Sequence, residues 1–532
     1  MSGIARASAL IGAGTLISRV TGLLRTIVLV AAIGSVNSRA GDAFATANQL
    51  PNSIYALIST GLITAVIVPQ IVKAAAHDDG GRAFISKLLT MGTVVLLATT
   101  AVAVALAPVL VTLYAPDFEP DQLALATAFA YWCLPQIFFY GIFALLGEIL
   151  NARRVFGPYT WAPIVNNLVS IVGFSVFILL FGPGQTLVSA WTPAMIATLA
   201  GTATHGIVLQ CDLLLFFWRR AGLHLRPDFR WRGIGLRRLG GLARWTFLMV
   251  VAGQFAGFIQ TRVLSSASGE GAAIMTSQNA WLIFMLPYSI IVVSIGTPYF
   301  TQLSERAHAG RDDLVRADLG TSVRTLGLLT MLATAALAAA SIPASRIFTD
   351  SPSEAVEAAL VLVCYLVSLV PLSVLFVVQR TFYAYDDTRT PFIFTFVQAI
   401  VVIATALLAG AALPLETLAA GVALGQSISI IVQVCLASWL LHRRLGSIGV
   451  RGWMLSLGRF ALAAVPAAAA GWGTFLLLGG VDGWTVSDRL LGALGTVIIG
   501  AVASIVYIAM LALLRAPELA AVRPLLQRFT RR

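Results

Sequence analysis

The sequence predicts an all-α, polytopic membrane protein with 14 transmembrane helices. Two observations predict this class: 58% of the 532 residues are hydrophobic, and only 11% are charged. The mean hydropathy of +0.88 agrees with both. Because so few polar side chains cannot coat a core in water, the composition excludes a soluble enzyme.

The apolar runs locate the individual helices. A helix needs about 20 apolar residues to cross ~30 Å of hydrocarbon, and Gly or Pro inside such a helix is tolerated when neighbouring helices surround it. Fourteen runs qualify, at residues 8–34, 42–72, 84–114, 121–151, 158–182, 187–218, 240–266, 272–302, 320–345, 355–383, 391–413, 416–441, 455–480 and 487–514.

Basic residues predict how these helices are oriented. Lys and Arg are concentrated after the even-numbered spans, including eight arginines from Arg219 to Arg244, whereas only Arg39, Arg346 and Arg489 follow odd-numbered spans. Short cytoplasmic loops carry the excess of positive charge in membrane proteins. Both termini are therefore expected in the cytoplasm, and the regular alternation supports the count of fourteen.

The net charge of +12 fits the same topology, because cytoplasmic loops face anionic lipid. Nucleic acid is therefore not expected as a partner. The four cysteines lie in apolar runs and are expected to be small buried hydrophobes. No CxxC or HExxH spacing predicts a metal site, no cofactor is expected, and the N-terminal run lacks the features of a cleaved signal peptide.

An internal repeat divides the chain into two lobes. Leu50-Pro51-Asn52-Ser53-Ile54 resembles Leu286-Pro287-Tyr288-Ser289-Ile290 at an offset of 236, and Pro135 and Pro371 are separated by the same offset. Because six spans are an even number, both lobes would enter the membrane from the same side and be related by a pseudo-twofold axis along the membrane normal. The expected parts are an N-lobe (1–220), a basic linker (221–239), a C-lobe (240–445), spans 13 and 14 (446–514) and a basic tail (515–532).

Four arginines fall inside predicted spans: Arg19, Arg25, Arg262 and Arg380. An arginine at the bilayer centre costs about 2.5–3.5 kcal/mol even on insertion scales, so it normally faces a cavity or a partner. The alternatives are snorkelling or a buried pair with Asp42, Glu148 or Asp212. A cationic cavity between two lobes favours an anionic substrate, and the planar guanidinium suits phosphate. A lipid with a diphosphate headgroup meets both requirements.

His205 in the sixth span is expected to bond a helix carbonyl rather than to relay protons. Asp212 lies two turns later on the same face, where the pair could bind a proton or a monovalent cation. Neutralisation of Asp212 by Arg219 or Arg220 is the equally open alternative.

Several strings together resemble the MurJ/MviN family of lipid II flippases: Ser18-Arg19, Gly22 and Arg25 in the first span, Asp42-Ala43-Phe44 in the second, and Tyr383-Ala384 with Asp387-Thr388-Arg389-Thr390-Pro391 after the tenth. The resemblance covers essentially the whole chain. It implies a transporter in a bacterial inner membrane that moves lipid II from the cytoplasmic to the outer leaflet by alternating access.

The resemblance also implies roles for individual residues. Ser18, Arg19 and Arg25 would hold the diphosphate, Asp42 would act in transport or gating, and a carboxylate at Asp387 would belong to a sodium site. The chain departs from some members at Tyr55, Thr60 and Leu282, where those members carry charged residues. We expect Arg262 to supply the missing positive charge, with Glu148 and Arg380 near the inner gate.

Three alternatives remain at this stage. A polysaccharide-lipid flippase or a drug/cation antiporter would belong to the same superfamily, but an antiporter of cations calls for an acidic cavity. A membrane glycosyltransferase would need a catalytic carboxylate or metal, and the loops after odd-numbered spans are short.

Overall fold

The computed structural model describes residues 3–59, 82–152, 155, 157–220, 227–229 and 236–519. Within these ranges every regular element is a helix, and thirteen helical stretches are long and apolar enough to cross a membrane. The all-α membrane class is therefore confirmed. The second expected span continues beyond Ile58 into residues outside the described ranges, so the count of fourteen stays a prediction. Most of the expected linker and tail also lies outside them.

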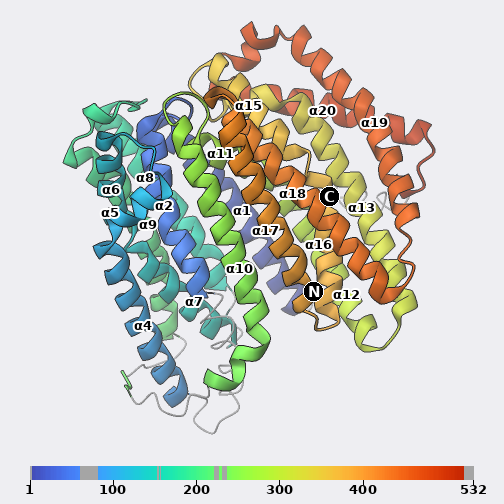
Figure 1. Cartoon of the computed structure of the whole chain (residues 1–532), viewed down its shortest axis with the longest axis horizontal. Coiled ribbons are helices and arrows are strands. Elements are labelled where there is room, and N and C mark those ends of the chain that lie inside the picture. Colours follow the sequence, from blue (N-terminus) through green and yellow to red (C-terminus); the bar gives the residue numbers. More distant parts are fainter. Residues whose placement is uncertain are drawn as a thin grey trace. The chain divides into compact units, whose positions relative to one another are not determined.

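The chain forms two compact units, Met1–Ser268 and Gly269–Arg532 (Figure 1). The first unit extends one helix beyond the expected N-lobe, because α10 (Leu236–Leu264) packs against α2 (Arg39–Ile58) and α5 (Ala107–Tyr114). This division by packing does not test the six-helix repeat, which remains a prediction.

The first unit contains eleven described helices and helical turns. In addition to α2, α5 and α10 they are α1 (Gly3–Ile33), α4 (Arg82–Ala105), α6 (Pro120–Cys133), α7 (Gln136–Ala152), α8 (Gly157–Phe181), η2 (Val188–Ala190), α9 (Pro193–Arg220) and η3 (Ser265–Ala267).

The second unit holds the remaining helices. They are α11 (Ile274–Pro287), η4 (Tyr288–Val293), α12 (Ser294–His308), α13 (Asp312–Ala339), α14 (Ser341–Arg346), α15 (Pro352–Leu366), α16 (Leu369–Ala384), α17 (Arg389–Ala412), α18 (Leu415–Leu445), α19 (Val450–Leu477), η5 (Gly480–Asp482), η6 (Trp484–Val486) and α20 (Arg489–Leu513).

Proline interrupts three of the described spans, two of them at positions that the repeat relates. The fourth span breaks between α6 and α7 at Pro135, and the tenth breaks between α15 and α16 just before Pro371. In the eighth span α11 ends at Pro287, and the π-helical turn η4 follows it. Proline lacks the N–H that a helix interior requires, which explains each break. Discontinuous spans in corresponding halves are typical of transporters.

Each unit has its own apolar core. In the first unit the ends of α4, α7 and α9 pack together through Leu88, Leu145 and Leu214, all of which are buried. In the second unit α13, α16 and α18 meet around Leu326, Phe382 and Leu441. These contacts fix the rotation of the helices that carry the charged residues.

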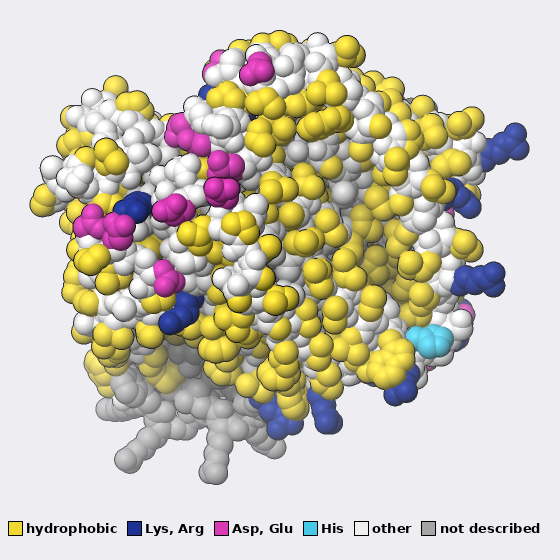
Figure 2. Space-filling view, turned by 45° about the horizontal axis from the view of Figure 1, so that its top comes forward, with side chains coloured by type: hydrophobic (Ala, Val, Ile, Leu, Met, Phe, Trp, Pro, Cys, Tyr) yellow, Lys and Arg dark blue, Asp and Glu magenta, His cyan; other side chains and the backbone are white. Residues whose placement is uncertain are grey.

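Hydrophobic side chains also cover most of the face shown in Figure 2, as expected of a surface that meets lipid. The expectation for the cysteines is only partly met: Cys133 and Cys211 are buried, Cys364 is half-buried and Cys435 is exposed. Cys435 differs because it lines a cavity.

Two polar anchors outside the spans stabilise the second unit. The buried Arg346 donates to the carbonyls of Val486 (2.8 Å), Thr349 (2.5 Å) and Ser487 (2.9 Å), which ties α14 to the turn before α20. Burial, together with the nearby Arg489, lowers the pKa of Arg346. At the other anchor, burial and a hydrogen bond to Asp312 raise the pKa of Tyr385.

Candidate functional site

The α1 helix carries three of the predicted binding residues. Arg19 is exposed, whereas Ser18 and Arg25 are half-buried. Neither arginine forms an ion pair with any residue in the described ranges. The alternative interpretation was a buried ion pair with Asp42, Glu148 or Asp212, and neither arginine forms one of these pairs. Two unpaired guanidinium groups on one membrane helix are available to an anion.

Contacts with α8 fix the rotation of α1. Asn167 Nδ2 donates to the Ser18 carbonyl (3.1 Å) and to Thr21 Oγ1 (3.0 Å). Gly22 lies at the same contact, where an added Cβ would come 3.5 Å from Asn167 Nδ2. Because Arg25 is two turns from Ser18, it shares this inward-facing side of α1, and Arg19 points away from it.

Inside the first unit, two tyrosines lie in the electrostatic surroundings of Arg25. It interacts electrostatically with Tyr140 of α7. The Tyr140 ring lies 5.5 Å from that of Tyr55 of α2, and Tyr55 interacts in turn with the half-buried Glu148. Arg25, Tyr140, Tyr55 and Glu148 thus belong to one electrostatically interacting group in the first unit. Tyr140 was missed from the sequence because a tyrosine in an apolar span has no distinguishing pattern.

Asp42 lies in a buried hydrogen-bond network. Ser268 Oγ donates to Asp42 Oδ2 (2.6 Å) and accepts from Gln122 Nε2 (2.8 Å), which also donates to the Arg39 carbonyl (3.0 Å). Ser38 caps α2 just before Asp42 by accepting from the Gly41 N–H (2.9 Å). The network joins the start of α2 to the last residue of the first unit. No sequence pattern pointed to Ser268 or Gln122.

Arg262 lies near the end of α10, where its side chain is exposed and donates to the Leu113 carbonyl (3.3 Å). One turn later Ser265 Oγ donates to Asp117 Oδ2 (3.0 Å). No contact among the described residues joins Arg262 to Arg19 or Arg25. The structure thus places Arg262 beside the connection between α5 and α6, and its role with the α1 arginines remains a prediction.

In the second unit Arg380 is half-buried between two aromatic rings. Its guanidinium carbon lies 5.2 Å from the ring centroids of both Phe300 and Phe376. Such cation–π contacts stabilise an arginine that has no carboxylate partner. Arg380 has none among the residues that the structure describes.

The carboxylate of Asp387 is already engaged. Its Oδ2 pairs with Arg444 (2.7 Å) and accepts from Thr390 Oγ1 (2.8 Å), while its Oδ1 accepts from the Thr390 N–H (2.9 Å). This arrangement binds Asp387 to the first turn of α17 and places the positive charge of Arg444 at the position expected for a cation. Asp212 of α9 is exposed, and it forms no ion pair with a residue whose side chain the structure describes. The side chains of Arg219 and Arg220 lie outside that part, so their pairing with Asp212 stays a prediction.

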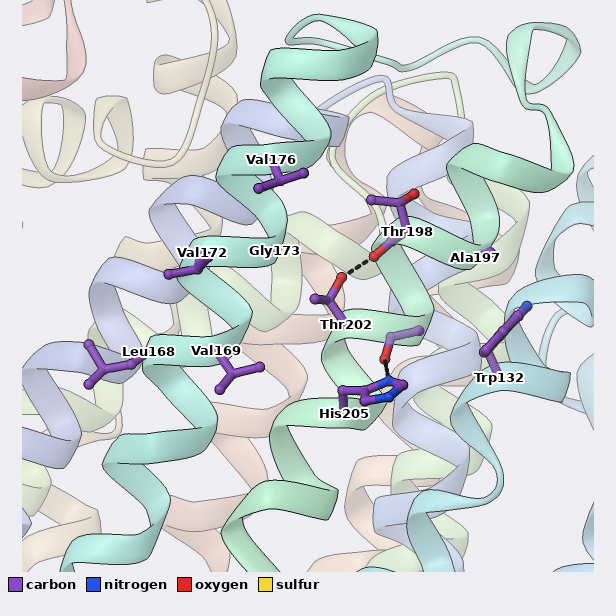
Figure 3. Close-up of a pocket in the computed structure, with 11 residues that line it drawn as sticks. Trp132, Leu168, Val169, Val172, Gly173, Val176, Ala197, Thr198, Thr202 and His205 are labelled. Atoms are coloured by element: carbon purple, nitrogen blue, oxygen red, sulfur yellow. Dashed lines mark hydrogen bonds between the residues drawn. The ribbon is translucent and has the colours of Figure 1, made fainter.

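His205 bonds a carbonyl of its own helix, as expected: its Nδ1 donates to Gly201 (3.1 Å). Figure 3 shows the ring in a pocket lined by α6, α8 and α9, between Trp132 on one side and Leu168 and Val172 on the other. The pocket has a volume of about 620 Å³ and is lined mainly by apolar side chains. It contains none of the charged residues discussed above.

Comparisons with known proteins show the family of the chain. The family model described as "Lipid II flippase MurJ" matches residues 30–494. The probable lipid II flippase MurJ of Rhizobium meliloti (strain 1021) is 27% identical over 419 residues, which cover 75% of this chain and 74% of that protein. The corresponding protein of Synechocystis sp. is 24% identical over 530 residues, covering 97% and 95%.

Solved structures share the fold. A structure of lipid II flippase MurJ in an inward closed conformation matches with a TM-score of 0.72 and 19% identity over 93% of this chain and 98% of that one. An inward-facing multidrug resistance MATE family transporter matches with a TM-score of 0.60 and 16% identity over 80% and 98%. Since the family model covers most of the sequence, the chain belongs to the lipid II flippase MurJ family.

Proposed function

We propose that the chain moves lipid II from the inner to the outer leaflet of a bacterial plasma membrane, with both termini in the cytoplasm. The names of its relatives support the substrate, and the basic loops support the orientation. One observation carries the binding step: Arg19 and Arg25 lie on one membrane helix without an acidic partner in the described ranges. A diphosphate would neutralise them and accept their hydrogen bonds.

In this proposal Arg25 holds the diphosphate while Tyr140 and Tyr55 line the way towards Glu148. Phenol groups can donate hydrogen bonds to a headgroup without adding charge. Ser18 contributes by fixing α1 against α8 through its carbonyl. Arg19, which is exposed, would reach the headgroup through its long flexible side chain.

Alternating access would use different residues at the two ends of the molecule. Asp42 and Arg262 would act at the outer gate, and Glu148, Arg380 and Asp387 at the inner gate. The buried bond between Asp42 and Ser268 supports the first assignment, because it anchors the residue at which the chain leaves the first unit. The aromatic contacts of Arg380 support the second, because stacking can be exchanged for another partner more easily than a buried salt bridge can.

A monovalent cation is a further proposed partner. Because the Asp387 carboxylate is already bound by Arg444 and Thr390, Asp212 is the stronger candidate for binding the cation that would drive transport. Cation binding at Asp387 would require Arg444 to move first.

The same fold also occurs in a MATE transporter, so the fold does not distinguish a lipid II flippase from an antiporter of cationic drugs. The charge of the residues that bind the substrate does distinguish them. A carrier of cationic drugs needs carboxylates where its substrate binds. The α1 helix instead presents arginines, which would repel such a cargo.

The deciding experiment is reconstitution in vesicles with labelled lipid II. Arg19→Ala and Arg25→Ala should each slow flipping about tenfold or more, because a hydrogen bond to a charged group contributes ~1.5–3 kcal/mol. Lysine at either position should restore part of the rate, since it keeps the charge but loses the planar fork. Arg311→Ala is the matched control, because Arg311 is exposed and precedes α13.

Full activity of both alanine variants would contradict the assigned site. The label should be recovered in unmodified lipid II, since we propose transport without a covalent step; a new covalent product would instead favour a glycosyltransferase.

A further inference from the structure

A second cavity lies in the other unit, and none of the residues assigned above to the diphosphate lines it. Its volume is about 690 Å³, and α16, α18 and α19 form its walls. Val370 and Val434 belong to the apolar part, together with Leu457 of α19. Cys435 also lines the cavity and is exposed, which explains why this thiol is not part of the apolar core.

One end of this cavity is polar and basic. His442, Ser447 and Arg451 line it where α18 turns into α19. The turn depends on Gly446 and Gly449, both of which have a φ of 74°, a conformation that other residues adopt only with strain. The cavity thus combines an apolar length with a cationic end.

The arginines at this end have no acidic partner in the part of the chain that the structure describes. Arg443 lies beside the cavity with its guanidinium 3.9 Å from the ring centroid of Trp439, a lining residue. Among the described residues neither Arg443 nor Arg451 forms an ion pair, whereas the adjacent Arg444 is bound to Asp387. Both unpaired arginines are exposed, so an incoming anion would not have to displace a carboxylate.

The first turn of α19 adds to the positive potential there. Its N-cap is Gly449, which has no side chain to accept a hydrogen bond. The Gly449 carbonyl accepts from the N–H groups of Gly452 and Trp453. In the described part of the chain no acceptor is present for the N–H groups of Val450 and Arg451. The start of a 28-residue helix with free N–H groups favours an anion.

We propose that this cavity binds an anionic glycerophospholipid of the bilayer, with an acyl chain along the apolar walls and the phosphate at Arg451, His442 and Arg443. The exposed apolar side chains of Trp439 and Met454 open the cavity towards lipid rather than towards water. A soluble phosphate would leave the apolar length unfilled, and a cationic or zwitterionic lipid would not satisfy the unpaired arginines. The proposal is independent of lipid II transport and concerns a lipid that stays bound.

Cys435 provides a built-in reporter for the test. The full-length protein is placed in nanodiscs of phosphatidylcholine, with or without phosphatidylglycerol, and its reaction with an uncharged, membrane-permeant maleimide is followed. A bound acyl chain should shield the thiol, so phosphatidylglycerol should slow the labelling severalfold. The Cys435→Ser variant measures the background from the other three cysteines.

Arginine variants then test the headgroup contact. Since each basic residue near an anionic headgroup is worth about 1 kcal/mol, Arg443→Gln or Arg451→Gln should raise the phosphatidylglycerol concentration needed for half-protection about fivefold, and the double variant about 25-fold. Lysine at either position should largely preserve protection. Arg311→Gln is the matched control, because Arg311 is exposed and outside the cavity.

Equal labelling in both nanodiscs, or protection that survives in the double variant, would overturn the proposal. So would protection by a polyprenyl diphosphate but not by phosphatidylglycerol, because the cavity would then belong to the transported lipid. A flipping assay on the double variant distinguishes this cavity from the transport site. If the variant loses lipid protection but flips lipid II at the normal rate, the two arginines bind the phospholipid and take no part in transport.

Discussion

The buried carboxylate of Asp42 shows how much a single side chain depends on distant partners. It accepts from Ser268, which is 226 residues away, and Ser268 is held in turn by Gln122. Replacing Asp42 with Ala would leave this hydroxyl without its acceptor. We expect Asp42→Ala to lower the free energy of unfolding by about 1–3 kcal/mol, the usual cost of an unsatisfied buried polar group.

Asp42→Asn separates the hydrogen bond from the charge, because an amide oxygen can still accept from Ser268. It should retain most of the thermal stability, measured as Tm in detergent, while transport falls if the charge acts in gating. The same Tm for Asp42→Ala and the unaltered protein would contradict the contact.

Arg346 is a buried cation that donates to backbone carbonyls, so we expect it to have a structural role. Three backbone carbonyls accept from it, and Asp350 is bound by Arg489 instead (2.5 Å). Arg346→Ala should therefore destabilise the attachment of α20 to α14 by about 2–3 kcal/mol, because it leaves buried carbonyls unpaired.

Limited proteolysis of the turn before α20 would measure this local loosening, and Arg489→Ala, which removes a more exposed pair, should have a smaller effect. Equal protease resistance of Arg346→Ala and the unaltered protein would exclude the structural role.

At the scale of helices, hydropathy predicted the spans well because lipid requires long apolar helices. The breaks at Pro135 and Pro371 were not predicted, since a proline in a membrane helix can be either tolerated or disruptive. The candidate site residues other than Asp387 lie on helices, but the side chains around them were not foreseen. Tyr140 lies beside Tyr55 because α7 packs against α2, and that packing is a tertiary property with no local pattern in the sequence.

The repeated breaks lead to a prediction about bending. A proline within a helix removes one hydrogen bond and weakens the helix at that point. Pro135→Ala and Pro371→Ala should each allow a straighter, stiffer span, so we expect slower flipping with unchanged or slightly higher Tm. Pro163→Ala is the control, because Pro163 lies inside α8 without interrupting it. If all three variants flip lipid II equally fast, the breaks do not serve transport.

At the scale of the whole molecule, the main electrostatic feature is positive charge on membrane helices. Arg19, Arg25 and Arg380 have no carboxylate partner among the described residues, whereas the carboxylate of Asp387 is neutralised by Arg444. The empty transporter would then carry net positive charge within the membrane. Moving one such charge through the field changes its free energy by about 2.3 kcal/mol per 100 mV.

A cytoplasm at negative potential would therefore draw the empty cationic site back to the inner side, where the next diphosphate binds. The bound diphosphate would neutralise the site for the outward step, so the return step alone would depend on voltage. We expect lipid II exposure at the outer leaflet to slow when valinomycin and potassium clamp the potential at zero, at fixed pH and without ATP. Arg25→Gln, which removes one of these charges, should weaken the voltage dependence of whatever flipping remains.

A rate that is the same at zero and at inside-negative potential would exclude this reset. Coupling to an ion gradient through Asp212 or Asp387 would then be the mechanism to test, by replacing each with Asn in vesicles that carry a sodium or proton gradient.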